Sequence, residues 1–362
     1  MNRIHRGRLV AVLSSIALAS FAVRAASADQ TRGNPLGVES VIEVPISPSA
    51  TNAVKDATKS LQHAQPKAGA TPEQRSMAQR GGARAGAGNN GDGMRAESRY
   101  PGDVQYQGGQ TLGSSVQHAI FVNPTPTCPA NACWGDPIGF LRDLNQSAFI
   151  HVTDQYVGTK ADDRYPVGSN YVVNYPVAPG HRLTDLDIEI IAYSAATFSG
   201  QHGYGHVYHV FLPPGQDLCF DGSNQVCYSP DDAASFSFCA YHSSFGVNGF
   251  GNVVYSAEPF QKVNGCSVRP NTPNGQLADS TNDTLSHEAV EAITDPDGDA
   301  WWNMLDNGLF GQEIGDECQF ITFTPTNVYG DPSDIRLNGK SYAIQPEYSN
   351  AGHVCAVGKA ER

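Results

Sequence analysis

Basic residues are scarce in most of this sequence. Of the 23 Lys and Arg residues in the chain, 10 lie in residues 101–362, and the same region contains 29 Asp and Glu residues. Binding to nucleic acid or to an anionic membrane surface requires clustered Lys and Arg. We therefore expect no nucleic-acid partner, and cations are the natural ligands of so acidic a surface.

Long apolar segments are also missing after the N-terminus, because no later run reaches the roughly 18 to 20 apolar residues of a transmembrane helix. The first residues have a different pattern. Arg3, Arg6 and Arg8 precede an uncharged run, and Ala26-Ser27-Ala28 is a small-residue cleavage pattern. We predict a signal peptide over residues 1–28, a secreted protein in the extracellular or periplasmic space, and no membrane insertion after signal cleavage.

The sequence has no Cys-x-x-Cys pair, which argues against a zinc ribbon. Its eight cysteines are an even number, and an exported protein meets an oxidising environment, so we expect disulfides. Spacing favours local pairs, although sequence alone leaves the connectivity open. The favoured pairs are Cys128 with Cys133, Cys219 with Cys227, Cys239 with Cys266, and Cys318 with Cys355.

Residues 29–113 are rich in Ala, Gly, Gln, Asn and Pro and cannot bury much apolar surface. We interpret this region as a low-complexity linker or a pro-segment. Val41–Ile46 could form a short strand or a docking segment within it. Residues 114–362 have a globular composition and are long enough for one domain with a substantial core.

Several segments have the pattern of regular secondary structure. Short β-branched or aromatic runs bounded by Gly, Pro and Asn predict strands of one sheet. These runs are residues 119–122, 206–212, 234–241 and 252–255. Helices are predicted over residues 138–145, from Thr184 to Tyr193, and from near Asp279 to just before Pro296. The mixture predicts an α+β fold, in which a mixed sheet packs against a few helices.

The last predicted helix carries the sequence His287-Glu288-Ala289-Val290-Glu291. Residues four apart share a helix face, so His287 and Glu291 can reach one point, with Glu288 beside them. This is the geometry of a zincin helix, in which His-Glu-x-x-His supplies two metal ligands and a general base. Here Glu291 replaces the second His, and we expect a single zincin-like domain stapled by disulfides.

A zincin requires a third ligand from further along the chain. Glu313 and Asp316 lie about twenty residues downstream in Glu-Ile-Gly-Asp. We predict Glu313 as the third ligand and Asp316 as the residue that orients the ligand His, with the reverse assignment also open. Zinc is the expected metal, although a site with one His and two carboxylates is anionic enough to favour manganese or calcium.

The residues that follow the helix offer a different cation site. Asp295, Asp297 and Asp299 alternate like the start of an EF-hand loop. The sixth position is Ala300 instead of Gly, and the twelfth is Asp306 instead of Glu. A calcium loop of another type therefore stays open.

Four histidines outside this helix are weaker candidates. His202, His206 and His209 lie at a strand entry, where His206 and His209 point to opposite faces. His242 could lie near the site, but a single His is more often structural.

The chain also contains six short segments in a recognisable order. They are Tyr208–Phe211, Phe238–His242, Val254–Ser256, Pro273–Gly275 with Ala278-Asp279, Thr294–Pro296 and Gly315–Cys318. Together they resemble the Exordium or phosphate-induced protein family over about residues 200–355. The resemblance is closest from Ser286 to Cys318.

The resemblance implies a secreted, extracellular or cell-wall-associated protein. Plant members of that family are linked to growth responses, have no settled enzymatic role and lack the His-Glu pair. Bacterial-type relatives have Ser-His-Glu and Glu-Ile-Gly-Asp-x-Cys, as this chain does. The site positions that the resemblance carries over are His287, Glu288, Glu291, Asp295, Glu313 and Asp316.

We therefore expect a secreted metal-dependent hydrolase, a zinc peptidase with Glu288 as general base, acting on an extracellular peptide or cell-wall substrate. The alternative is a non-enzymatic extracellular or cell-wall-associated binding protein with a calcium site or a structural metal. The substrate, the oligomeric state and the fate of residues 29–113 are open at this stage.

Overall fold

The computed structural model describes residues 40–60, 63–66, 103–178, 180–303, 313–319 and 333–358. The chain divides into two compact units, Met1–Val38 and Glu39–Arg362, and every described residue belongs to the second unit. The predicted signal peptide, residues 1–28, lies outside the described residues. Within the described ranges, none of the helices combines the length and the hydropathy needed to cross a bilayer.

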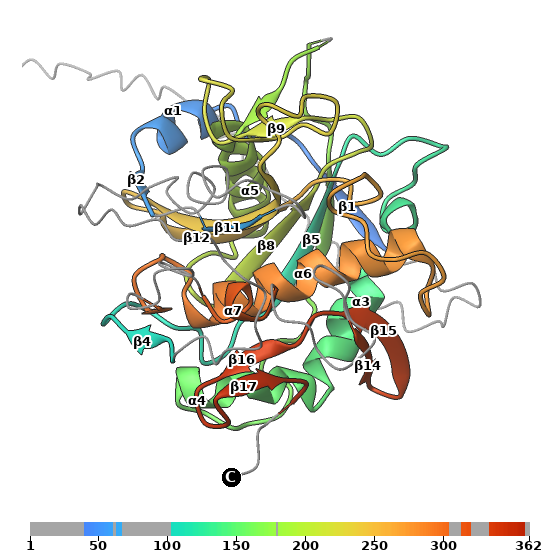
Figure 1. Cartoon of the computed structure of the whole chain (residues 1–362). Helices are drawn as coiled ribbons and strands as arrows, with labels where there is room; N and C mark the ends of the chain where they lie inside the picture. Colours follow the sequence, from blue (N-terminus) through green and yellow to red (C-terminus); the bar gives the residue numbers. More distant parts are fainter. Residues whose placement is uncertain are drawn as a thin grey trace, which may run out of the picture. The chain divides into compact units, whose positions relative to one another are not determined.

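An eight-stranded mixed sheet lies at the centre of the described part (Figure 1). The strand order is β1-β6-β5-β8-β12-β11-β2, and β3 also pairs with β11. The first five strands in this order are mutually parallel, whereas β11 is antiparallel to β12, β2 and β3. The strands are β1 (Val41–Val44), β2 (Thr58–Lys59), β3 (His63–Pro66), β5 (Val116–Val122), β6 (Asn170–Val173), β8 (His206–Phe211), β11 (Phe238–Val247) and β12 (Gly251–Glu258).

Both faces of the sheet are covered, which explains the nearly continuous apolar run of β5. Ile120 and Val122 pack into one core cluster with helices α1 (Ala50–Lys55) and α5 (Asp185–Ser199). The alternate residues, Ala119 and Phe121, pack into a second cluster with α3 (Pro137–Asn145) and α6 (Gln276–Thr294). Figure 1 shows α5 and α6 on opposite sides of the sheet. The predicted α+β fold with a mixed sheet and a few helices is confirmed.

The helix ends follow local sequence signals. Thr184 and Asp187 form a capping box at the start of α5, and Gly200 ends it in the left-handed conformation at φ 69°. The Asp136 carboxylate accepts a hydrogen bond at the start of α3, before a proline in the first turn. Helix α6 begins at Gln276, slightly earlier than predicted, and ends at Thr294 as expected.

The strand predictions for residues 119–122, 206–212 and 252–255 are confirmed. The prediction for residues 234–241 is displaced, because β11 begins at Phe238 and continues to Val247. Asp232 accounts for the difference. Its carbonyl accepts hydrogen bonds from the backbone N–H groups of Ser235 and Phe236, which makes this stretch a turn.

Residues 40–66 contribute to the sheet, although they fall within the predicted linker or pro-segment, residues 29–113. Strand β1 lies at one edge of the sheet, and β2 and β3 lie at the other. Val44, Ala50 and Val54 are at most 2% exposed in the core beside α5. The folded part therefore begins well before residue 114. The sequence indicated a short strand or a docking segment only at Val41–Ile46. Removal of this segment by cleavage stays a prediction.

The four predicted disulfides are confirmed. Cys239–Cys266 links β11 to the loop before α6, and Cys318–Cys355 links α7 (Asp316–Gln319) to β17 (Val354–Ala356). These two bonds hold the segments on either side of α6. The remaining elements are β4 (Gln105–Tyr106), η1 (Ala132–Trp134), η2 (Phe149–Thr153), α4 (Asp154–Val157), β7 (Leu183–Thr184), β9 (Leu218–Cys219), β10 (Cys227–Tyr228), β13 (Trp301–Trp302), β14 (Ser333–Leu337), β15 (Lys340–Ile344) and β16 (Glu347–Ser349).

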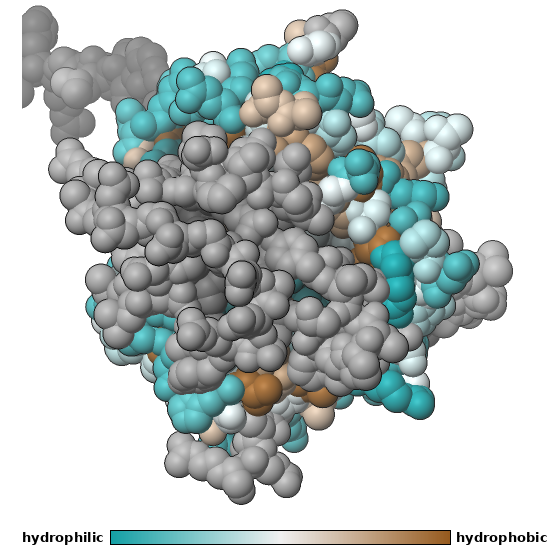
Figure 2. Space-filling model, viewed as in Figure 1, coloured by the Kyte–Doolittle hydropathy of each residue, from teal (hydrophilic) through white to brown (hydrophobic). Residues whose placement is uncertain are grey.

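Figure 2 shows one face of the molecule. Where described residues form this face, hydrophilic side chains predominate and the hydrophobic areas are small and separate. A group of buried ionisable side chains lies inside the protein, between α6, the sheet and the segment that contains α7.

Candidate metal centre

Helix α6 buries the predicted motif completely. His287 and Glu288 are 0% exposed, and Glu291 is 1% exposed. Charged side chains are rarely fully buried unless they are paired or bind a metal. The burial of three such side chains on one helix indicates a binding or catalytic site.

The first group that could hold a metal consists of His287, Glu291 and Asp316. His287 Nε2 lies 3.1 Å from Glu291 Oε2 and 3.7 Å from Asp316 Oδ1. None of these three atoms has a hydrogen-bond partner. The helix spacing thus brings His287 and Glu291 to a common point, as the sequence predicts, and Asp316 completes the group.

Glu291 is held in place by the segment that supplies Asp316. Its Oε1 atom accepts hydrogen bonds from the backbone N–H groups of Gly315 and Asp316, each at 3.1 Å. A Cβ atom on Gly315 would lie 2.8 Å from both Glu291 Oε1 and His287 Nδ1. Only glycine therefore allows the backbone to approach Glu291 so closely. The Gly in Glu-Ile-Gly-Asp was the sequence signal for this contact.

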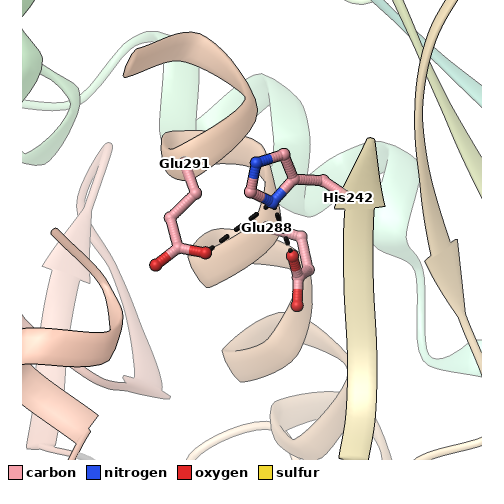
Figure 3. Close-up of side chains that lie close together, drawn as sticks. All are labelled: His242, Glu288 and Glu291. Atoms are coloured by element: carbon pink, nitrogen blue, oxygen red, sulfur yellow. Dashed lines mark hydrogen bonds and ion pairs between the residues drawn. The ribbon is translucent and has the colours of Figure 1, made fainter. Parts of the chain in front are cut away.

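The second group consists of His242, Glu288 and Glu291. His242 projects from β11 toward two carboxylates that α6 supplies one turn apart (Figure 3). Its Nδ1 atom lies 3.1 Å from Glu288 Oε2 and 3.7 Å from Glu291 Oε2. The sequence indicated that His242 could lie near the site but favoured a structural role, because strand spacing gives no sign of what a distant helix places opposite.

Two further contacts orient His242. Its Nε2 atom lies 3.1 Å from the carbonyl oxygen of Asp295, the C-cap residue of α6. The same nitrogen lies 3.6 Å from Glu313 Oε2. Glu313, the predicted third ligand, thus lies beside His242, whereas Asp316 lies with His287 and Glu291.

The electrostatics of the site are dominated by carboxylates. Burial lowers the pKa of His287, but the charges of Glu291, Glu288 and Asp316 outweigh burial and hold that pKa well above its usual value. Burial, together with the charge of Glu291, raises the pKa values of Glu313 and Asp316 well above normal. Burial tends to raise the pKa of Glu291, but the charge of His287 outweighs it, and the pKa falls. A place that stabilises a cationic imidazole so strongly also suits a metal ion.

More buried carboxyl groups surround the two groups. Glu258 and Glu347 are both 0% exposed. Burial raises the pKa of Glu258 to about 8 and that of Glu347 well above normal. Ser256 Oγ bridges Glu258 Oε1 (2.7 Å) and His209 Nδ1 (2.8 Å). Sequence reasoning missed Glu258, although a Glu that ends an apolar strand directly before Pro259 was an available signal.

The acidic residues of the possible calcium loop, Asp295, Asp297 and Asp299, do not converge on a common point. Asp295 Oδ1 accepts hydrogen bonds from the backbone N–H groups of Asp299 and Ala300, both at 2.7 Å, and so holds the turn. Asp297 accepts hydrogen bonds from the hydroxyl groups of Tyr204, at 2.6 Å, and of Ser244. Among the described residues, the groups close enough to share a metal are the two above, and this loop is not one of them.

The histidines near residue 206 are occupied by hydrogen bonds. His206 Nδ1 pairs with His118 Nε2 at 3.0 Å. His209 Nε2 donates to Gln117 Oε1 at 2.8 Å. Their partners lie on adjacent residues of β5, so His206 and His209 do point to opposite faces.

Comparisons with known proteins leave the family open. No family model matches the sequence, and no curated protein matches it. A solved structure titled "Structure of a chaperone-substrate complex" aligns with 63% of this chain and 36% of that chain, at 9% identity and a TM-score of 0.21. A likeness at that level carries no argument about fold or function.

Proposed function

We propose that this protein is an exported metal-dependent hydrolase, a zinc peptidase in its simplest form, acting on an extracellular peptide or a cell-wall substrate. The observation that carries the proposal is the convergence of His287 Nε2, Glu291 Oε2 and Asp316 Oδ1. All three atoms are buried and lack hydrogen-bond partners. The two carboxylate oxygens lie 3.1 Å and 3.7 Å from His287 Nε2.

The donor set fits a divalent metal. Two ligand atoms that each lie 2.0–2.2 Å from a tetrahedral zinc are roughly 3.3–3.6 Å apart, which is close to the observed separations. The ion-pair partners of Glu291 and Asp316 in the described structure are imidazoles, which must lose a proton to bind metal. We assign Asp316 as the third ligand instead of Glu313, because Asp316 shares a group with His287.

A zinc ion bound there would polarise a carbonyl group and lower the pKa of water. Glu288 is the residue that takes the proton from the attacking water. Its Oε2 atom lies 3.1 Å from His242 Nδ1, while its buried Oε1 atom has no hydrogen-bond partner. The zincin-like character that we propose for the domain rests on this arrangement of base and ligands along α6.

Replacement of the base tests the proposal. Glu288→Gln should retain the metal held by His287 and lose cleavage of labelled casein and of a peptide library by about a hundredfold or more, as expected for loss of a general base. Elemental analysis and cleavage rates are measured on the same samples of full-length secreted protein.

The matched control is Glu189→Gln. Glu189 is also a buried helical glutamate, but it lies on α5 and pairs with Lys59. This variant should cleave at the wild-type rate. Turnover that survives in Glu288→Gln removes Glu288 as the base, and protein without metal after zinc reconstitution removes the metal centre.

The complete burial of the group favours one alternative, a structural metal in a non-enzymatic extracellular binding protein. In that case chelation should lower the melting temperature, and no peptide or cell-wall polymer should be cleaved. An extracellular location is supported by the four disulfides and by the predicted signal peptide. The Exordium-like resemblance, which includes the Ser-His-Glu and Glu-Ile-Gly-Asp segments, implies the same location.

A further inference from the structure

Glu291 is placed between two imidazoles. Its Oε1 atom is committed to the backbone N–H groups of Gly315 and Asp316. Its Oε2 atom has no hydrogen-bond partner and lies 3.1 Å from His287 Nε2 and 3.7 Å from His242 Nδ1. One carboxylate oxygen therefore faces a nitrogen on each side.

The orientation of His242 prepares Nδ1 as a metal ligand. A backbone carbonyl only accepts hydrogen bonds, so His242 Nε2 donates its proton to the carbonyl of Asp295. In the neutral ring this leaves the lone pair on Nδ1, directed at Glu288 and Glu291 (Figure 3). Metal-binding histidines commonly donate their other N–H to a carbonyl in this way.

A lone pair and carboxylate oxygens at this distance repel each other unless a proton or a metal cation lies between them. We propose that a second divalent cation binds here, held by His242 Nδ1, Glu288 Oε2 and Glu291 Oε2. Glu291 then bridges it to the cation held by His287 and Asp316. The inference rests on the proposed function, because it adds a second metal to the same centre.

The charges agree with two cations. Two divalent ions would balance Glu288, Glu291, Asp316 and Glu313 if all four are ionised when the metals bind. The Glu313 Oε2 atom lies 3.6 Å from His242 Nε2. Two-metal hydrolytic sites hold their ions about 3.5–4 Å apart and stabilise both the attacking and the leaving oxygen. Glu288 would bind through Oε2 and keep Oε1 for the proton. An oxygen-rich site of this kind also accepts manganese.

Metal stoichiometry tests the inference without any substrate. Chelated full-length protein is dialysed against Zn²⁺ and, separately, against Mn²⁺, and bound metal is measured by elemental analysis. We expect two equivalents in the wild type and one equivalent in His242→Gln. His287→Gln should also bind one equivalent, and Glu291→Gln should bind less than two because it loses the bridge.

His209→Gln is the matched control. His209 is another fully buried strand histidine, but both of its nitrogens are hydrogen-bonded to Gln117 and Ser256. This variant should keep two equivalents. Because His242→Gln could fail to fold, the wild-type Mn²⁺ protein is also examined by electron paramagnetic resonance, where a bridged pair gives an exchange-coupled spectrum.

The outcomes separate the two proposals. One equivalent in the wild type, unchanged in His242→Gln, overturns the second site and leaves the proposed function standing. Two equivalents without magnetic coupling also overturn it, because the second ion would lie elsewhere. No metal in any form overturns both.

Discussion

At the scale of single residues, the candidate metal centre depends on contacts that residue spacing along the sequence does not predict. His242 and Asp316 are far apart in the sequence, yet they lie on either side of Glu291. Their contributions come from strand β11 and from the first residue of α7, each placed by the packing around α6. The helix motif alone identified His287, Glu288 and Glu291.

Gly315 provides a prediction at this scale. Gly315→Ala should weaken zinc binding by about tenfold or more, in the range seen when residues that orient metal ligands are replaced. The added Cβ would lie 2.8 Å from Glu291 Oε1 and from His287 Nδ1, so both ligands must move. Competition with a chelating dye measures the affinity.

Gly113→Ala is the control for that substitution. A Cβ atom on Gly113 would meet only Thr159 Cγ2, at an ordinary contact distance of 3.7 Å. Zinc affinity should be unchanged in this variant. Equal affinities in Gly315→Ala and the wild type would show that the loop yields freely and does not position Glu291.

At the scale of elements, strands and helices with strong local signals were predictable. Thr184 and Asp187 cap α5, and the apolar run Ala119–Val122 of β5 is buried on both faces, so local sequence and tertiary environment agree. Helix α6 was predictable as well, although most of its residues are buried and many of them are polar. The strands before residue 66 were largely missed, because short polar strands form only when a sheet edge is present to pair with them.

The N-terminal strands give the prediction at this scale. A chain that starts at residue 67 should fail to fold, whereas a chain that starts at Glu39 should melt at the wild-type temperature. Deletion removes Val44 and Val54 from the core and uncovers both edges of the sheet. Each buried valine contributes about 1.5–3 kcal/mol, against a total stability of about 5–15 kcal/mol.

Solubility, circular dichroism and thermal melting of the two chains provide the measurement. A soluble, cooperatively melting protein that starts at residue 67 would contradict this prediction. It would then support a pro-segment that is dispensable once the rest has folded.

At the scale of the whole molecule, the buried imidazoles and the buried carboxyl groups act in opposite directions on the pH dependence of stability. Burial lowers the pKa of His209 to about 3 and that of His118 to about 4, so both are neutral in the folded protein. Their usual pKa is 6.5. At these two positions the unfolded chain binds more protons below that pH, so their contribution to stability falls as the pH falls. Buried carboxyl groups such as Glu258, whose pKa is raised to about 8, contribute in the opposite direction.

The expected effect is a loss of about 1.4 kcal/mol per pH unit for each of these groups between about pH 6 and pH 4. Urea unfolding of the chelated protein across this range measures the slope. The slope for His209→Gln should differ from the wild-type slope by one such contribution, so that the variant gains stability relative to the wild type as the pH falls. Parallel slopes for the wild type and the variant would mean that His209 is not neutral in the fold.

The sequence by itself determined the α+β composition and the helix that places His287 and Glu291 on one face, and its cysteine spacing favoured the four disulfides that the structure contains. These features depend on spacing and on the properties of neighbouring residues. Only the tertiary structure decided that His242 faces Glu288 and Glu291, that Asp316 joins His287 while Glu313 lies beside His242, and that residues 40–66 complete the sheet. Contacts between distant segments depend on how the sheet and α6 pack, and that information is not contained in any local pattern.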